Sequence, residues 1–362
     1  MQITSIETQP VSIAVTPDLS IVSSLGAHRI SRYVVVIVRD DEGHVGYGEA
    51  TVMPMWSGET QEGALAAIDN VLAPAVIGRD AREITAAAEA MDKALIDNPF
   101  AKAAIEMALL DLVGKALGVP VTTLLGGARR SEAIPLKFSI GAFSPTHAAN
   151  VAQSMADRGF RAVKVKVGLD VKTDIERVAA IRAAMGDNFP IGADANGGWN
   201  ERQTVEALPH LERLGVNVLE QPLPRGEYRA TARIRQRTSI PIMLDEGVFT
   251  ARHAVEAVRT EACDVISIYP GKNGGILRSM QIAQIAETAG LECVIGSNLE
   301  WDLGTAAMLH TACAIPNLSA AVNHDIIGPI YHERSIATTP IRYQDGCACL
   351  PKGPGLGTEV EV

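Results

Sequence analysis

An almost constant interval separates the polar residues that follow a series of short apolar segments between residues 134 and 325. Successive intervals are 28, 26, 25, 27 and 25 positions, for Lys166, Asp194, Glu220, Asp245, Lys272 and Ser297. One strand, one helix and their loops occupy about this length, so one structural position recurs in each unit. Eight apolar segments with seven helical segments between them predict a parallel barrel rather than an open sheet. An open, doubly wound sheet would require a glycine-rich phosphate loop after its first strand, and the sequence has none.

The rest of the chain has a different pattern. Residues 33–40 and 47–50 alternate as strands around an Asp/Gly turn at 41–46, and residues 60–118 are helical. We therefore expect an α+β capping domain on a modified (β/α)7β TIM barrel, within the α/β class. The predicted boundaries are 1–128 for the N-terminal part of the capping domain, 129–338 for the barrel, and 339–362 for a tail that returns to the capping domain.

Composition excludes several functions. The 362 residues carry a net charge of −10, which disfavours binding to nucleic acid or to an anionic membrane. No apolar run approaches the roughly 20 residues of a membrane span, and the N-terminus lacks a signal-peptide pattern. The odd count of five cysteines favours reduced thiols in the cytoplasm. Cys347 and Cys349 could form half of a zinc site, but no second Cys/His pair has suitable spacing nearby.

Three consecutive units each place a carboxylate after an apolar strand: Asp194, Glu220 and Asp245. Strand ends of a parallel barrel meet at one mouth, where three carboxylates would repel one another unless a cation lay among them. Oxygen ligands without His or Cys select Mg²⁺, with Mn²⁺ as the alternative ion. Each residue could instead cap the following helix, but three in succession favour a metal site.

Two lysines flank this predicted metal site. Lys166 ends the second barrel strand and Lys272 follows the sixth, so they would face each other across the mouth. A lysine close to a divalent cation and to another lysine has a lowered pKa, because each positive neighbour disfavours the charged form. It can then act as a base near neutral pH, removing the α-proton of a carboxylate to form a metal-stabilised enediolate. Taken alone, Lys272 could also be a solvated loop lysine.

These motifs resemble the enolase superfamily, within it the muconate lactonizing enzyme subgroup. The matching segments are KVKVG at 164–168, DAN at 194–196, EQP at 220–222, DE at 245–246, KNGG at 272–275, the capping-domain signature at 101–127 and GPGLG in the tail at 353–357. The resemblance covers essentially the whole chain. It implies Mg²⁺ on Asp194, Glu220 and Asp245, with Lys166 and Lys272 as the acid/base pair. It also implies that Lys164 is an electrostatic partner that helps lower the pKa of Lys166 and contacts the substrate carboxylate. It also implies a homo-oligomer, with an octamer as one form.

The resemblance leaves the substrate open. A small carboxylate is expected, and a muconate-cycloisomerase-like isomerase is favoured. The alternatives are a racemase or epimerase of an N-acyl amino acid or dipeptide, a sugar-acid dehydratase, a catalytically dead metal-binding barrel and a binding module for an acidic ligand. The seventh strand end lacks the His of mandelate-racemase-like members, and the Lys pair disfavours a dead barrel. Asn323-His324-Asp325 only partly matches the Asp-x-Asp of similar dipeptide epimerases.

Substrate contacts are expected from the strand ends and from two capping-domain loops, at 16–29 and 52–60. His28 and Trp56 on these loops could equally be a surface histidine and a packing tryptophan, and Glu300 could be a helix N-cap. The full predicted set is Asn196, Glu246, Ser297, Asn298, Glu300, His28, Trp56 and Asp325.

Overall fold

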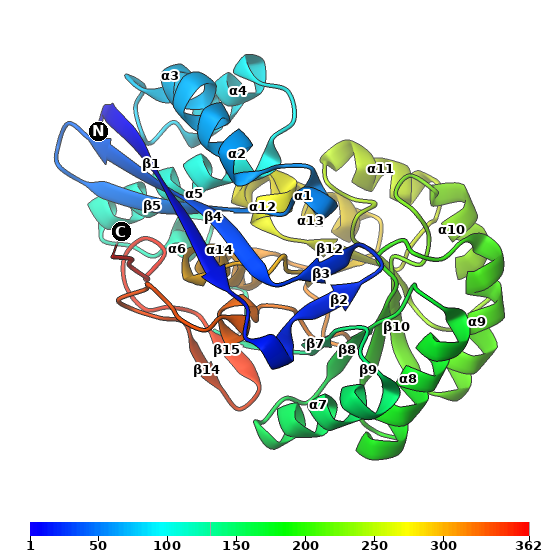
Figure 1. The fold of residues 1–362 in the computed structure, drawn as a ribbon. Coiled ribbons are helices and arrows are strands. Elements are labelled where there is room, and N and C mark those ends of the chain that lie inside the picture. The colour runs from blue at the N-terminus through cyan, green and yellow to red at the C-terminus, as the bar shows by residue number, and fades with distance from the viewer. Residues whose placement is uncertain (131, 362) are drawn as a thin grey trace.

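The computed structural model describes residues 1–130 and 132–361. Seven parallel strands curl into a barrel wall, with helices on its outside (Figure 1). In spatial order the strands are β7 (Phe138–Ile140), β8 (Val163–Lys166), β9 (Ile191–Asp194), β10 (Val216–Glu220), β11 (Ile242–Leu244), β12 (Val265–Ile268) and β13 (Glu292–Ile295). The helices that follow them are α7 (Pro145–Asp157), α8 (Val171–Met185), α9 (Glu201–Arg213), α10 (Tyr228–Arg235), α11 (Ala251–Arg259), α13 (Ile276–Thr288) and α14 (Asp302–Ala314). The predicted α/β barrel class is confirmed.

The barrel closes through a segment less regular than the eighth strand that the sequence predicts at 318–325. Leu318 bridges Cys293 of β13, and His324 bridges Leu136 beside β7. Backbone hydrogen bonds from Ser319 and Asp325 to β13 complete the seam. The predicted first strand at 134–142 is also divided, since β6 (Ala133–Pro135) leaves the barrel and only β7 joins it.

An antiparallel sheet of β1 (Ile3–Ala14), β4 (Ile30–Asp40) and β5 (Val45–Val52) packs on helix α5 (Pro99–Leu117). The remaining elements of this part are η1 (Pro17–Leu19), β2 (Ile21–Ser23), β3 (Gly26–His28), α1 (Pro54–Ser57), α2 (Gln61–Ala67), η2 (Ile68–Leu72), α3 (Ala73–Val76), α4 (Ile84–Ala94) and α6 (Val121–Leu124). Helix α5 begins at Pro99 and ends at Leu117, with the left-handed Gly118 as its C-cap. A Cβ at Gly48 would lie 1.9 Å from the Ala104 carbonyl oxygen, so glycine permits this close sheet–helix contact.

The C-terminal tail lies against both parts of the molecule (Figure 1). Strands β14 (Arg342–Gln344) and β15 (Cys347–Cys349) pair antiparallel with β6. Further on, the Val121 amide donates to the Gly355 carbonyl, and the Leu356 amide donates to Asp111 of α5 at 2.7 Å. The tail therefore contacts the N-terminal elements as expected, while the domain boundaries at 128/129 and 338/339 stay predictions. No helix in the described ranges is long and apolar enough to cross a membrane.

Candidate active site at the carboxyl ends of the strands

Neighbouring strands bring the three predicted metal ligands to one end of the barrel. Asp194 and Glu220 are the last residues of β9 and β10 and pair with each other in the parallel register. Asp245 follows β11 directly. All three are buried, and so are all four residues of β8, including Lys164 and Lys166. Both faces of these strands are therefore covered, which explains why an alternating pattern places lysines inside the molecule.

Each of the two predicted acid/base lysines pairs with a different carboxylate. Lys166 Nζ lies 2.6 Å from Asp194 Oδ2 and donates to Asn196 Oδ1 at 2.8 Å. Lys272, on the short helix α12 (Pro270–Asn273), lies 2.7 Å from Asp245 Oδ1. It also donates to the carbonyl oxygens of Asp245 and Ser267. In the order of the strands, Glu220 on β10 therefore lies between Lys166 on β8 and Lys272, which follows β12.

Glu220 is the least satisfied polar group of the site. Neither of its carboxylate oxygens accepts a hydrogen bond from the described residues, although Lys164 Nζ lies 3.0 Å from Oε2. Burial and the neighbouring Asp194 charge raise the pKa of Glu220 to about 8. A buried carboxylate without donors is costly unless a cation approaches it. The oxygen-only donor set of Asp194, Glu220 and Asp245 therefore fits Mg²⁺.

Lys164 connects this group to the segment that closes the barrel. Its Nζ lies 3.0 Å from Asp325 Oδ2 and 3.3 Å from Asp194 Oδ2. Burial alone would lower the pKa of Lys164, but Asp325, Glu220 and Asp194 raise it well above its usual value. Lys164 is thus paired with three of the buried carboxylates, and its role as an electrostatic partner of the acid/base lysines stays a prediction.

Asn196 and Glu246, both predicted as substrate contacts, form a hydrogen-bonded chain to the capping loops. Asn196 Nδ2 donates to Glu246 Oε1 at 2.8 Å, and Trp56 Nε1 donates to the same oxygen at 2.9 Å. Asn196 adopts a left-handed backbone conformation with φ 43°. Because Asn196 also accepts from Lys166, this chain fixes the Lys166 ammonium and ties the 52–60 loop to the barrel.

The loop after β13 is organised by Glu300. Ser297 Oγ donates to Glu300 Oε2 at 2.7 Å, and the Asn298 amide donates to the same carboxylate. Asn298 Nδ2 donates to the Thr51 carbonyl of β5 at 3.0 Å, which joins the barrel to the capping sheet. Burial raises the pKa of Glu300 to about 7. Glu300 therefore shapes the loop, and Ser297 and Asn298 reach the cavity.

One cavity lies above these groups. Its wall includes nine of the predicted site residues: His28, Trp56, Lys164, Lys166, Asn196, Asp245, Ser297, Asn298 and Asp325. The capping loops add Ile21, Ser23, Leu25 and Met53, and the barrel adds Ser139, Leu299 and Ile327. Asp194, Glu220, Glu246 and Glu300 are not part of this wall, and Lys272 lines a different cavity, together with Arg225 and Phe249. His28 is buried and its Nε2 lies 2.8 Å from Ser31 Oγ, so it is not a free surface histidine.

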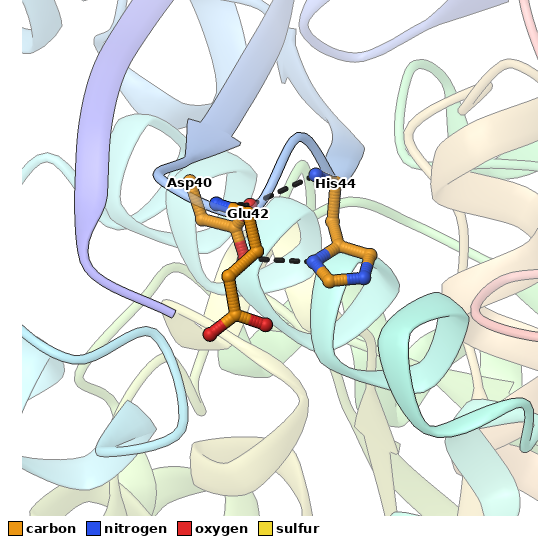
Figure 2. A group of neighbouring side chains, drawn as sticks. All are labelled: Asp40, Glu42 and His44. Atoms are coloured by element: carbon orange, nitrogen blue, oxygen red, sulfur yellow. Dashed lines mark hydrogen bonds and ion pairs between the residues drawn. The ribbon is translucent and has the colours of Figure 1, made fainter.

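A second group of possible metal ligands lies elsewhere, at the turn between β4 and β5 (Figure 2). Asp40 accepts from the Glu42 and His44 amides and from His44 Nδ1, while Glu42 pairs with the N-terminal amine. These hydrogen bonds explain the cluster as a hairpin turn. The turn is at the end of the capping sheet distant from the barrel (Figure 1).

Comparison with known proteins decides the family. The profile described as "Mandelate racemase / muconate lactonizing enzyme, N-terminal domain" matches residues 5–126, and "Enolase C-terminal domain-like" matches residues 147–361. The chain belongs to the mandelate racemase/muconate lactonizing enzyme family of the enolase superfamily. It is 33% identical to the N-succinyl-L-Arg/Lys racemase of Bacillus cereus, over 99% of this chain and 96% of that protein.

Relatives in this family share its fold and differ in activity. Muconate cycloisomerase 1 of Rhodococcus opacus is 33% identical over 100% of this chain and 97% of its own. A dipeptide epimerase structure from Enterococcus faecalis, complexed with Mg and the dipeptide L-Leu-L-Tyr, superposes with a TM-score of 0.93. That match is 32% identical and covers 99% of each chain. Racemases, epimerases and cycloisomerases are all isomerases, so this member of the enolase superfamily is an isomerase.

Two polar residues of the site were missed from the sequence. Lys137, just before β7, is buried and pairs with Asp325 at 2.8 Å. Ser139 of β7 donates to Asp325 at 2.9 Å and lines the cavity. The signal was available, because Lys137 interrupts an apolar segment in the same way as Lys164 and Lys166 interrupt theirs.

Proposed function

We propose that this family member is an Mg²⁺-dependent isomerase that moves the α-proton of a carboxylate substrate, most closely in the manner of a muconate cycloisomerase. The observation that carries the proposal is the pairing of Lys166 with Asp194 and of Lys272 with Asp245. In the order of the strands, Glu220 lies between these two pairs. Two amines on opposite sides of one carboxylate group can serve two faces of a bound substrate.

Asp194, Glu220 and Asp245 would hold the metal. A bound Mg²⁺ would supply positive charge beside the substrate carboxylate. In its free-base form, Lys166 takes the α-proton at Nζ, or returns it, on one face of the substrate. Lys272 is proposed to do the same on the opposite face from its position on Asp245, which lines the cavity, and Asn196 orients Lys166. The wall of capping-loop side chains limits the access of water.

Exchange of the α-proton with solvent tests this reaction. The protein would be incubated with Mg²⁺ in D₂O and with cis,cis-muconate, N-succinyl amino acids and dipeptides. We expect deuterium at the α-carbon of the substrate or product, detected by NMR and mass spectrometry. Absence of label in every acid tried, with the metal bound, would refute proton transfer as the function.

Racemisation or epimerisation of an N-acyl amino acid or dipeptide is the second candidate. The 33% identity to the N-succinyl-L-Arg/Lys racemase favours it. The same incubation separates the two candidates, since a racemase scrambles the α-centre while a cycloisomerase forms a lactone. We further propose a cytoplasmic homo-oligomer, testable by fractionation and by light scattering. An octamer is the form that the resemblance suggests.

A further inference from the structure

Lys137 is a buried lysine with no place in the proposed proton transfer. It precedes β7 and is only 2% exposed. Its Nζ donates to the Asn323 carbonyl at 2.6 Å and pairs with Asp325 Oδ2 at 2.8 Å. Asp325 is its only carboxylate partner among the described residues. An apolar side chain of similar volume would pack here at no greater cost, so stability alone does not explain a buried ammonium group.

Asp325 faces the cavity but its charge is already matched. Ser139 Oγ donates to Oδ1 at 2.9 Å, while Lys137 and Lys164 both approach Oδ2. Lys164 is shared with Asp194 and Glu220, so it supplies only part of its charge to Asp325. Lys137 is therefore the cation dedicated to this carboxylate.

The position of Lys137 determines how it acts. Asp325, Ser139 and Lys164 form the cavity wall, and Lys137 is not part of that wall. It reaches Asp325 from behind, where a small ligand does not touch it. A carboxylate left unpaired on a cavity wall attracts a cationic ligand group, whereas one flanked by two ammonium groups does not.

We propose that Lys137 is a specificity-determining residue that neutralises Asp325 and restricts the substrate to carboxylates without an ammonium group at this wall. N-acylated amino acids and unsubstituted diacids belong to this class, and dipeptides with a free amino terminus do not. This inference rests on the proposed function, because it assigns a substrate class to the same cavity.

The test measures binding with two pairs of acids, and in each pair only one member carries an ammonium group. They are N-acetyl-L-Ala-L-Glu with L-Ala-L-Glu, and adipate with 3-aminoadipate. Calorimetric titration of the Mg²⁺-loaded protein gives each dissociation constant. In the wild-type protein we expect the acid without the ammonium group to bind at least about tenfold more tightly in one pair or both.

Lys137→Met keeps an unbranched side chain, one atom shorter than lysine, and removes its charge. We expect this variant to bind the acid with the ammonium group more tightly, which lowers the preference for the acid without it about tenfold. In Lys137→Met/Asp325→Asn the carboxylate itself is gone, so the gain should disappear. Lys172→Met, on the exposed face of α8, is the matched control and should leave the preference unchanged.

Equal binding of both members in the wild type would overturn the proposal, and this measurement needs no variant to fold. Failure of all four acids to bind would also overturn the proposal. An unchanged preference in a folded Lys137→Met protein would do the same. Deuterium exchange reports the proposed function separately. A preference that depends on Lys137 without any α-exchange would support this inference and refute the proton transfer.

Discussion

At the scale of single residues, lysines inside apolar strands are the most informative positions of this chain. Lys164 and Lys166 are both buried and lie on carboxylates contributed by other strands. The alternation of β8 predicts that they share a face, but the partners that neutralise them come from the following units. Lys137 carries the same sequence signal, and its partner Asp325 is 188 positions away. Only the closed barrel brings that pair together.

Removal of either proposed acid/base lysine should abolish proton transfer. We expect Lys166→Ala and Lys272→Ala each to reduce α-proton exchange by about 10³-fold or more, since a positioned acid or base contributes 10²- to 10⁴-fold. Circular dichroism should show an intact fold. Lys172→Ala on α8 is the control and should retain full exchange. A lysine variant that keeps most of its activity would contradict the assignment.

Glu220 offers a test of the metal site that does not depend on activity. Because burial and the Asp194 charge raise the pKa of Glu220, its neutral isostere in Glu220→Gln should change the melting temperature of the metal-free protein little. Mg²⁺ should stabilise the wild-type protein by several degrees and the variant much less. Differential scanning calorimetry with and without Mg²⁺ measures both effects.

The control for that measurement is Glu287→Gln on the exposed face of α13, which should respond to Mg²⁺ as the wild type does. Equal stabilisation of Glu220→Gln and the wild type by Mg²⁺ would place the ion elsewhere.

At the scale of elements, helices α13 and α14 have N-termini that are capped by carboxylates from the N-terminal capping part. Glu49 of β5 accepts from the Trp301 and Gly304 amides at the start of α14. Glu106 of α5 accepts from the Ile276 and Leu277 amides at the start of α13. Acceptors at a helix N-terminus satisfy amides that have no partner within the helix. A sequence pattern cannot find caps of this kind, because local motifs reveal only acceptors that are close in the chain.

His310 of α14 joins α6 to the tail. Its Nδ1 accepts from the Thr122 amide and its Nε2 lies 3.1 Å from the Leu356 carbonyl, so the buried ring is neutral. Burial lowers its pKa to about 4. Between pH 6.5 and 4 the unfolded chain binds a proton at His310 that the folded protein does not bind. Stability should therefore fall as the pH falls through this range, by about 2–3 kcal/mol from this residue.

Urea unfolding at several pH values measures this effect. In His310→Gln the side chain retains an acceptor and a donor but does not titrate, so the difference from wild type should shrink toward pH 4. A constant difference across the range would show that His310 does not titrate on unfolding.

At the scale of the whole molecule, the C-terminal tail holds the two parts together. It adds β14 and β15 to β6, and it meets α5 where Asp111 accepts from the Leu356 amide. Asp111 also accepts from the Tyr47 amide of β5. A single buried carboxylate thus connects the tail, a helix and the capping sheet, so the tail is part of the core.

Gly355 is where this docking is tightest. It has φ +67°, and a Cβ there would lie 2.2 Å from Asp111 Oδ1. We expect Gly355→Ala to destabilise the protein by about 3 kcal/mol or more, from backbone strain together with the clash. Gly118→Ala, at a similar φ of +69° but with no described atom within 4 Å of the added Cβ, should cost only about 1–2 kcal/mol. Chemical denaturation of both variants compares them, and equal losses would contradict the tight docking.

The sequence by itself determined the barrel class, the strand-end positions of the site residues and the family resemblance. Period-2 and period-3.6 patterns and the interval of 25–28 residues are local properties, and parallel strands necessarily end on one side of a barrel. Only the tertiary structure decided that residues 318–325 close the barrel through isolated bridges, that Glu300 shapes a loop behind the cavity, and that Lys137 neutralises Asp325. Each of these depends on contacts between distant segments, whose geometry is set by packing and burial rather than by local pattern.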